Sequence, residues 1–133
     1  MLGAMASKSV PGGVAAGLRR VGAVVGAMVL VVALMIGTNL LLVRWIAPGA
    51  AVFLAVTLAL AAMYHTLGGY LCAVLARGAR SAAVGVVGLG AAIMLGSVIQ
   101  TWPTVPPWYS IAMLAIAPSF LWIGSQRYAR PRG

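Results

Sequence analysis

The sequence predicts an all-α integral membrane protein, a four-transmembrane-helix bundle with both termini in the cytoplasm. Three observations support this fold class: 63% of the 133 residues are hydrophobic, only 7% are charged, and the charges stand between long apolar runs. Soluble domains average roughly 45–50% apolar and about 25% charged residues. Because lipid can accept so much apolar surface and a water-soluble core cannot, the chain is expected to cross a membrane.

The first 20 residues precede the first apolar run. They are small and basic, and Pro11, Gly12 and Gly13 are expected to break a continuous helix. We interpret residues 1–20 as a flexible basic arm in the cytoplasm. Since this segment contains basic residues and no acidic ones, an organellar transit peptide is the alternative.

Four apolar runs follow and define the transmembrane domain, residues 21–126. The first run is longer than the hydrophobic core of a signal peptide, so it is expected to remain as a span. Short connections predict that consecutive helices pack side by side. A basic cytoplasmic tail, residues 127–133, ends the chain. The predicted spans are residues 21–43, 50–75, 81–101 and 109–124.

Nearly all the basic residues fall on one side of these spans. Eight of the nine lie in the terminal segments or in the turn between the second and third spans, and only Arg44 lies opposite. The positive-inside rule therefore places both termini in the cytoplasm. The membrane is expected to be the bacterial inner membrane, with an organellar inner membrane as the alternative. Residues expected at anionic lipid headgroups are Arg19, Arg20, Arg77, Arg80, Arg127 and Arg130.

The net charge of +9 does not indicate a nucleic-acid partner, because the basic residues are few and stand at the ends of apolar runs. Small residues instead point to helix partners, which are other membrane subunits or further copies of the chain. Small residues four positions apart let helices approach closely. We therefore expect a stripe of Gly88, Ala92 and Gly96 to pack inside the bundle. The other predicted packing residues are Gly22, Gly26 and Gly69.

The sequence contains no Asp and no Glu. Carboxylate acid–base pairs, Ser-His-Asp triads and carboxylate-bound Mg²⁺ or Ca²⁺ sites are therefore excluded. No nucleophile and base can be paired, and no metal-binding set can be assembled. We predict that the protein is not an enzyme.

His65 is the ionisable residue nearest the middle of a predicted span, and such residues are functional candidates. Ala61 and Gly69 lie four residues to either side, on the same helical face. The Ala61-x-x-x-His65 spacing resembles the Ala-x-x-x-His motif of light-harvesting antenna polypeptides, in which the histidine ligates bacteriochlorophyll. That resemblance implies a haem or chlorin ligand, whereas the simpler interpretation is a neutral imidazole hydrogen-bonded inside the bundle. Asn39 and Thr66 are the other polar candidates within the spans, since each needs a partner in lipid.

The second half of the chain resembles small uncharacterised bacterial four-span proteins, which pair a GGY-x-x-A-x-LA helix end with a later P-x-WY helix start. The residues that carry the resemblance are Gly68, Gly69, Tyr70, Ala73, Leu75, Ala76, Pro106, Trp108, Tyr109 and Pro118. The family implies four membrane helices and no known activity, so no functional residue is carried over.

Three functions are consistent with the sequence. The first is a non-catalytic membrane protein, an accessory or assembly subunit of a larger complex or a self-associating bundle. The second is a small transporter or pore acting as a homo-oligomer, with a polar path lined by Thr38, Asn39, His65, Thr66 and Pro118. The third is a membrane subunit that binds a haem or chlorin through His65.

Overall fold

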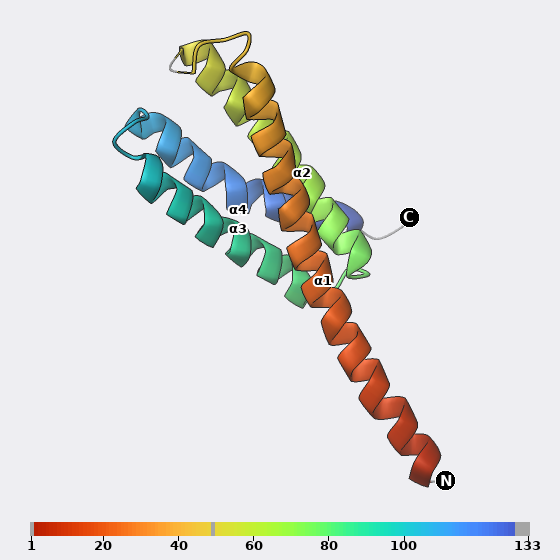
Figure 1. Cartoon of the computed structure of the whole chain (residues 1–133). Helices are drawn as coiled ribbons and strands as arrows, with labels where there is room; N and C mark the ends of the chain where they lie inside the picture. Colours follow the sequence, from red (N-terminus) through yellow and green to blue (C-terminus); the bar gives the residue numbers. More distant parts are fainter. Residues whose placement is uncertain (1, 49, 130–133) are drawn as a thin grey trace.

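A computed structural model describes residues 2–48 and 50–129, which form four helices. They are α1 (Leu2–Leu42), α2 (Ala51–Leu75), α3 (Arg80–Thr101) and α4 (Pro107–Ala129) (Figure 1). Each contains a stretch long and apolar enough to cross a membrane: Gly13–Leu42, Ala51–Leu75, Arg80–Thr101 and Pro107–Tyr128. The prediction of four membrane-spanning helices is confirmed at this level, and the helices indicate an integral membrane protein.

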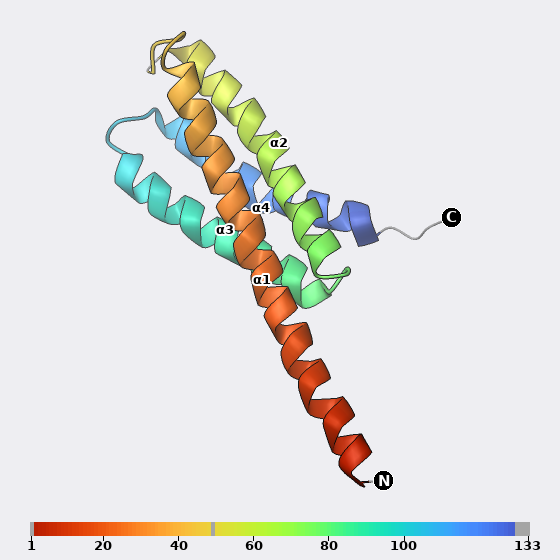
Figure 2. The ribbon, with the colours of Figure 1, turned by 45° about the vertical axis from the view of Figure 1, so that its right-hand side comes forward.

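Helix α1 begins much earlier than predicted. It is continuous from Leu2 to Leu42, so the expected break at Pro11–Gly13 is wrong and most of the predicted arm is helical. Proline in a helix removes one backbone hydrogen bond, but its φ is itself compatible with a helix. Alanine, leucine and methionine before Pro11 are strong helix formers. In both views, the first part of α1 extends away from the other three helices (Figures 1 and 2).

The helices do not pack simply in chain order. The most extensive contact joins α2 and α4, while α1 packs on α2, α3 packs on α4, and α1 also touches α3. The contact between α2 and α3 is the smallest of the five, although only residues 76–79 connect them. A short turn keeps two helix ends close, but side-chain packing decides which helices remain in contact along their length.

Two clusters of buried side chains form the core. The first lies toward the α2–α3 turn and consists of Ala23, Ala27, Met28, Cys72, Ala76, Ala82, Val86 and Leu121. The second lies toward the other end and consists of Ala61, Met94, Val98, Met113 and Ala117. Both are rich in alanine and methionine, which lets the helices approach closely and fill irregular gaps.

Glycines bring α2 and α4 into backbone contact. A Cβ atom added to Gly69 would lie only 2.8 Å from the carbonyl carbon of Leu121. A Cβ atom on Gly124 would similarly lie 2.8 Å from the carbonyl carbon of Thr66 and 2.9 Å from the Tyr70 nitrogen. Each helix therefore uses one glycine to admit the backbone of the other. This reciprocal contact is what lets the two helices cross so closely.

The predicted small-residue stripe on α3 does not pack inside the bundle. Gly88, Ala92 and Gly96 are exposed, and a Cβ atom on either glycine would meet nothing within 4 Å. Instead, Gly90 on the opposite face admits the Leu121 side chain. Spacing identifies residues that share a helical face, but an apolar helix in lipid carries no hydrophobic signal for which face points inward. Among the described residues, a Cβ atom on Gly22 or Gly26 of α1 would likewise meet nothing within 4 Å.

Candidate functional site

His65 lies in the interior of the bundle, with 2% of its surface exposed. Its Nδ1 is 2.6 Å from the carbonyl oxygen of Ala61, one turn earlier in α2. Because a carbonyl oxygen can only accept, Nδ1 carries the proton and donates this bond. The imidazole is therefore held by its own helix.

The surroundings of His65 do not fit a haem or a chlorin. Ala61 is 1% exposed and belongs to the core cluster that includes Met94 and Met113. Gly69, the other small neighbour, is covered by the backbone of Leu121. A flat macrocycle needs open space beside the ring, and α3 and α4 occupy the space next to Ala61 and Gly69.

The other polar residues within the spans are placed apart from one another. Asn39 is half-buried and, with Thr38, Thr57 and Tyr64, lines a cavity of about 10 Å³ between α1 and α2. One water molecule needs roughly 10–15 Å³, so this cavity is at the lower limit. Thr66 instead donates to the Ala62 carbonyl at 2.8 Å and lies on the α4 side of α2. Asn39 and Thr66, two of the residues predicted to line a polar path, thus lie on different sides of α2 within one chain.

A hydrogen bond joins α1 and α2 within the spans. The Thr38 and Tyr64 hydroxyl oxygens lie 2.6 Å apart. Interhelical bonds of this kind contribute about 0.6 kcal/mol on average, and at most about 1.7 kcal/mol, in membrane bundles.

In a double-mutant cycle of Thr38→Val and Tyr64→Phe, we expect a coupling energy in that range. Detergent unfolding measures it, and Thr101→Val with Tyr64→Phe is the control pair, because Thr101 bonds Ser97 in its own helix. A coupling equal to that of the control pair would contradict this contact.

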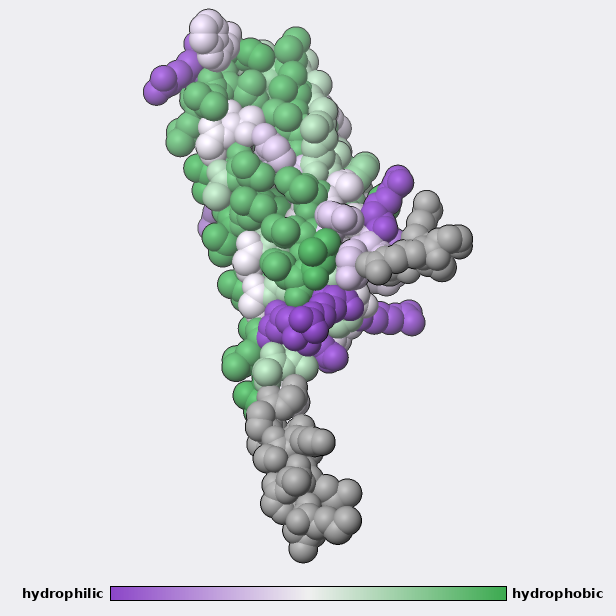
Figure 3. Space-filling view, turned by 90° about the vertical axis from the view of Figure 1, so that its right-hand side faces the viewer, coloured by the Kyte–Doolittle hydropathy of each residue, from purple (hydrophilic) through white to green (hydrophobic). Residues whose placement is uncertain are grey.

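The basic side chains collect at one end of the bundle. In Figure 3, most hydrophilic side chains, in purple, lie in a band across the lower part of a mostly hydrophobic surface, and a further one lies at the upper end. Arg19 and Arg20 on α1 and Arg127 on α4 are exposed at the basic end, close to Arg77 and Arg80 around the α2–α3 turn. Arg44 is exposed in the turn at the opposite end, and Arg130 lies outside the described residues. Among the predicted headgroup residues, the five described ones thus form a single basic end.

The α2–α3 turn holds an arginine in a backbone conformation that usually takes glycine. Arg77 has φ 54° and Gly78 has φ 73°. The left-handed conformation costs a residue with a side chain roughly 1–2 kcal/mol. The turn closes when the Gly78 nitrogen donates to the Ala73 carbonyl at 2.8 Å. Arg77 therefore stands at the basic end in a conformation that glycine would adopt without this cost.

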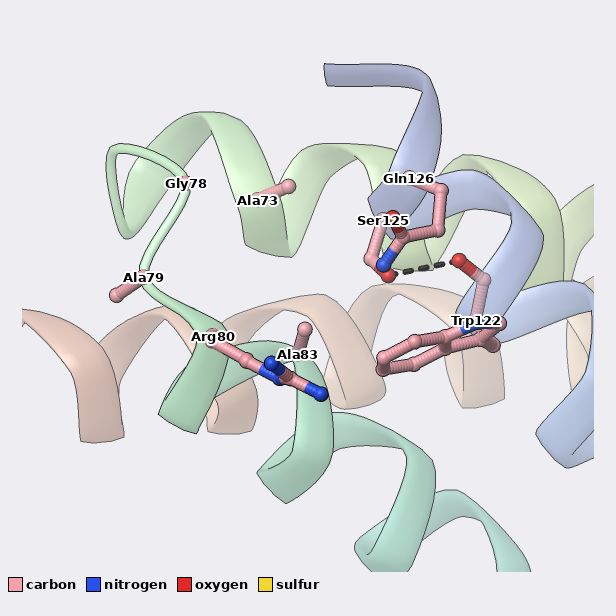
Figure 4. Close-up of a pocket in the computed structure, with 8 residues that line it drawn as sticks. All are labelled: Ala73, Gly78, Ala79, Arg80, Ala83, Trp122, Ser125 and Gln126. Carbon is pink, nitrogen blue, oxygen red and sulfur yellow. Dashed lines mark hydrogen bonds between the residues drawn. The ribbon is translucent and has the colours of Figure 1, made fainter. Parts of the chain in front are cut away.

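A pocket of about 310 Å³ opens at the basic end between the start of α3 and the last turns of α4. Its lining residues are Ala73, Gly78, Ala79, Arg80, Ala83, Trp122, Ser125 and Gln126 (Figure 4). Arg80 approaches it from α3, while Ser125 and Gln126 approach from α4. The Ser125 hydroxyl donates to the Trp122 carbonyl at 2.7 Å. The pocket thus combines a cation, an amide and an indole with small apolar walls.

Sequence reasoning missed several of these residues. Tyr64 could have been found, because a hydroxyl within a span needs a partner in lipid. Gly90 and Gly124 had no signal of their own, since isolated glycines are common throughout this glycine-rich chain. Trp122, Ser125 and Gln126 meet Arg80 only through the packing of α3 and α4.

In comparisons with known proteins, the chain matches no protein-family model, no curated protein and no solved structure.

Proposed function

We propose that this chain is a non-catalytic accessory or assembly subunit that binds a transmembrane helix of another membrane protein along the exposed face of α1. Its termini lie in the cytoplasm, and the membrane is the bacterial inner membrane. The orientation rests on the gathering of basic residues at the end that carries Arg19, Arg77 and Arg127, opposite Arg44. The costly left-handed Arg77 is consistent with a charge retained for this purpose.

The observation that carries the proposal is a stripe of small residues on α1 that the fold itself does not use. Gly22, Gly26, Ala33 and Gly37 are exposed, and their spacing places them on one helical face, on which Val29 and Leu30 lie between the two pairs. A Cβ atom on any of the three glycines would meet nothing within 4 Å. Glycine within a helix costs about 0.5–1 kcal/mol relative to alanine. The close contact that would offset this cost is therefore expected with another molecule. The exposed Gly88, Ala92 and Gly96 of α3 share this property but lack a pair of arginines like Arg19 and Arg20 at their end.

Charge complementarity favours a different protein over a second copy of this one. Arg19 and Arg20 are exposed at the cytoplasmic end of the stripe. With no Asp or Glu in the chain, a second copy has no acidic side chain to place beside them. Two parallel α1 helices would instead bring four arginines together, and like charges repel. We therefore expect a partner helix with small residues in the span and acidic residues at its cytoplasmic end.

The transporter and cofactor functions receive less support. The polar residues expected to line a path lie on different sides of α2. The space beside His65 is filled by Ala61's core neighbours and by the Leu121 backbone. The resemblance to small bacterial four-span proteins stays a prediction and supplies no activity.

The proposal is tested by photo-crosslinking in the native membrane. A photoreactive amino acid at Val29, which is 62% exposed and lies on the same face between Gly26 and Ala33, is expected to capture one membrane protein. The same amino acid at Ile99 on α3, 68% exposed, is the matched control and is expected not to capture it. Gly26→Leu, which fills open space on the stripe, should abolish the crosslink from Val29 while Gly88→Leu leaves it intact.

Each other result overturns the proposal. Capture of a second copy from Val29 would establish self-association in place of an accessory role. Equal capture from Val29 and Ile99 would show that crosslinking reflects collisions in the membrane. Failure of Gly26→Leu to reduce the crosslink would show that the stripe is not the contact.

A further inference from the structure

We propose that the pocket between α3 and α4 is a binding site for the phosphate headgroup of an anionic phospholipid, with Arg80 as the residue that recognises the phosphate. The inference is independent of the partner proposed above, because it concerns a different part of the surface. It rests on the pocket, on the charge of its lining and on its place along the bundle.

The first argument is that Arg80 has no acidic partner available in its own chain. The sequence contains no Asp and no Glu, so no side chain can neutralise it. Arg80 is the first residue of membrane-spanning helix α3, and it borders the pocket together with Ala79 and Ala83. A guanidinium next to apolar walls is less well screened than one in bulk water, so an anion is favoured there. Its planar fork of donors matches a phosphate with two parallel hydrogen bonds.

The second argument is the shape and polarity of the pocket. Its volume of about 310 Å³ is in the range of small-molecule sites, which begin at about 300 Å³. Gln126 contributes an amide that can both donate and accept, and it borders the pocket from α4. The Ser125 hydroxyl already donates to Trp122, so it has only acceptor capacity left for a ligand. This combination of groups suits a phosphodiester whose headgroup alcohol carries further hydroxyl groups.

The third argument is depth in the membrane. The pocket lies where α3 begins and where α4 approaches its end, at the boundary between the apolar spans and the basic end. Trp122, which is 38% exposed, forms one wall, and tryptophan prefers this interfacial level. A phospholipid places its phosphate at the same level, while its acyl chains can follow the apolar surfaces of α3 and α4. A glycerol headgroup can bond Gln126, whereas a choline headgroup brings a cation toward Arg80 and offers no hydroxyl.

The test is lipid binding to the purified full-length protein, measured by native mass spectrometry with phosphatidylglycerol and phosphatidylcholine. We expect the wild type to retain phosphatidylglycerol in preference to phosphatidylcholine. Arg80→Gln should weaken phosphatidylglycerol binding about tenfold, the effect of losing a charged hydrogen-bond donor. Arg80→Lys keeps the charge but loses the planar fork of donors, so its affinity for phosphatidylglycerol should lie between those of the wild type and Arg80→Gln.

Arg77→Gln is the matched control. It removes the same charge three residues before Arg80, and the Arg77 side chain does not line the pocket. We expect Arg77→Gln to change phosphatidylglycerol binding less than twofold, because an exposed charge outside the pocket contributes little to the affinity. Equal losses in Arg77→Gln and Arg80→Gln would overturn the site in favour of general attraction. The helical circular dichroism of every variant is recorded, and Arg80→Lys keeps the test decisive if Arg80→Gln does not fold.

A separate arm identifies the source of the phosphate. Inorganic phosphate at millimolar concentration is added to the lipid-loaded protein. We expect no displacement of phosphatidylglycerol, since free phosphate lacks acyl chains to hold it beside Trp122. Displacement that depends on Arg80 would overturn the lipid assignment and make the pocket a site for soluble phosphate esters.

Discussion

Replacing Gly69 by alanine is expected to separate α2 from α4 and to destabilise the bundle by about 3 kcal/mol or more, at the upper end of the range for overpacked cores. The added Cβ atom would lie 2.8 Å from the Leu121 carbonyl carbon, a distance that real Cβ atoms essentially never show. The obstacle is backbone, so no rotamer change can relieve it. Gly124→Ala is expected to act in the same way against Thr66. Unfolding of the purified variants by sodium dodecyl sulfate, followed by circular dichroism, measures the effect.

The glycines on the outer face of α3 provide the control. Gly88→Ala and Gly96→Ala place a methyl group in open space, so stability should change by no more than about 1 kcal/mol, in the stabilising direction because alanine is the better helix former. The double variant of Gly69 and Gly124 should lose less than the sum of the two single losses, since either substitution already forces the same helices apart. Equal stability of Gly69→Ala and Gly88→Ala would contradict the close crossing.

Leu121→Ala is expected to give a smaller but still large loss, about 2 kcal/mol, near the lower end of the range for buried leucine. Leu121 is fully buried and its side chain enters the spaces left by Gly68 and Gly90. In a membrane, transferring a leucine side chain between lipid and the core changes its free energy little, because the acyl chains are as apolar as the core. The remaining cost is the loss of dispersion contacts with the atoms that line the new cavity. The helices could close this cavity only by shifting toward one another.

Leu95 on α3 is the matched control for this truncation. It is 52% exposed, so Leu95→Ala removes the same atoms from a lipid-facing position and should change stability by less than about 0.5 kcal/mol. The same detergent unfolding experiment compares the two variants. A loss at Leu95 as large as that at Leu121 would show that the side chain of Leu121 is not enclosed as described.

The sequence predicted the positions of the spans better than the packing between them. The spans were predictable because the length of an uncharged apolar run is a direct consequence of bilayer thickness. Residues 50–75 and 81–101 differ by only one residue from α2 and α3. The N-terminal segment was not predictable in the same way, since Pro11 and Gly13 are helix breakers on average but do not interrupt α1. Local propensity is a weak guide where neighbouring residues favour the helix.

The sequence by itself determined the class of molecule and the chemistry that it lacks. Apolar length, the gathering of arginines and the complete absence of carboxylates are properties of the chain that no packing arrangement can change. Only the tertiary structure decided which small residues face inward. Gly69 and Gly124 lie against backbone, whereas Gly22, Gly26, Gly88 and Gly96 face outward. The physical reason is that hydrophobicity sorts inside from outside in water, while in lipid both faces of a helix are equally apolar, and shape alone selects the interface.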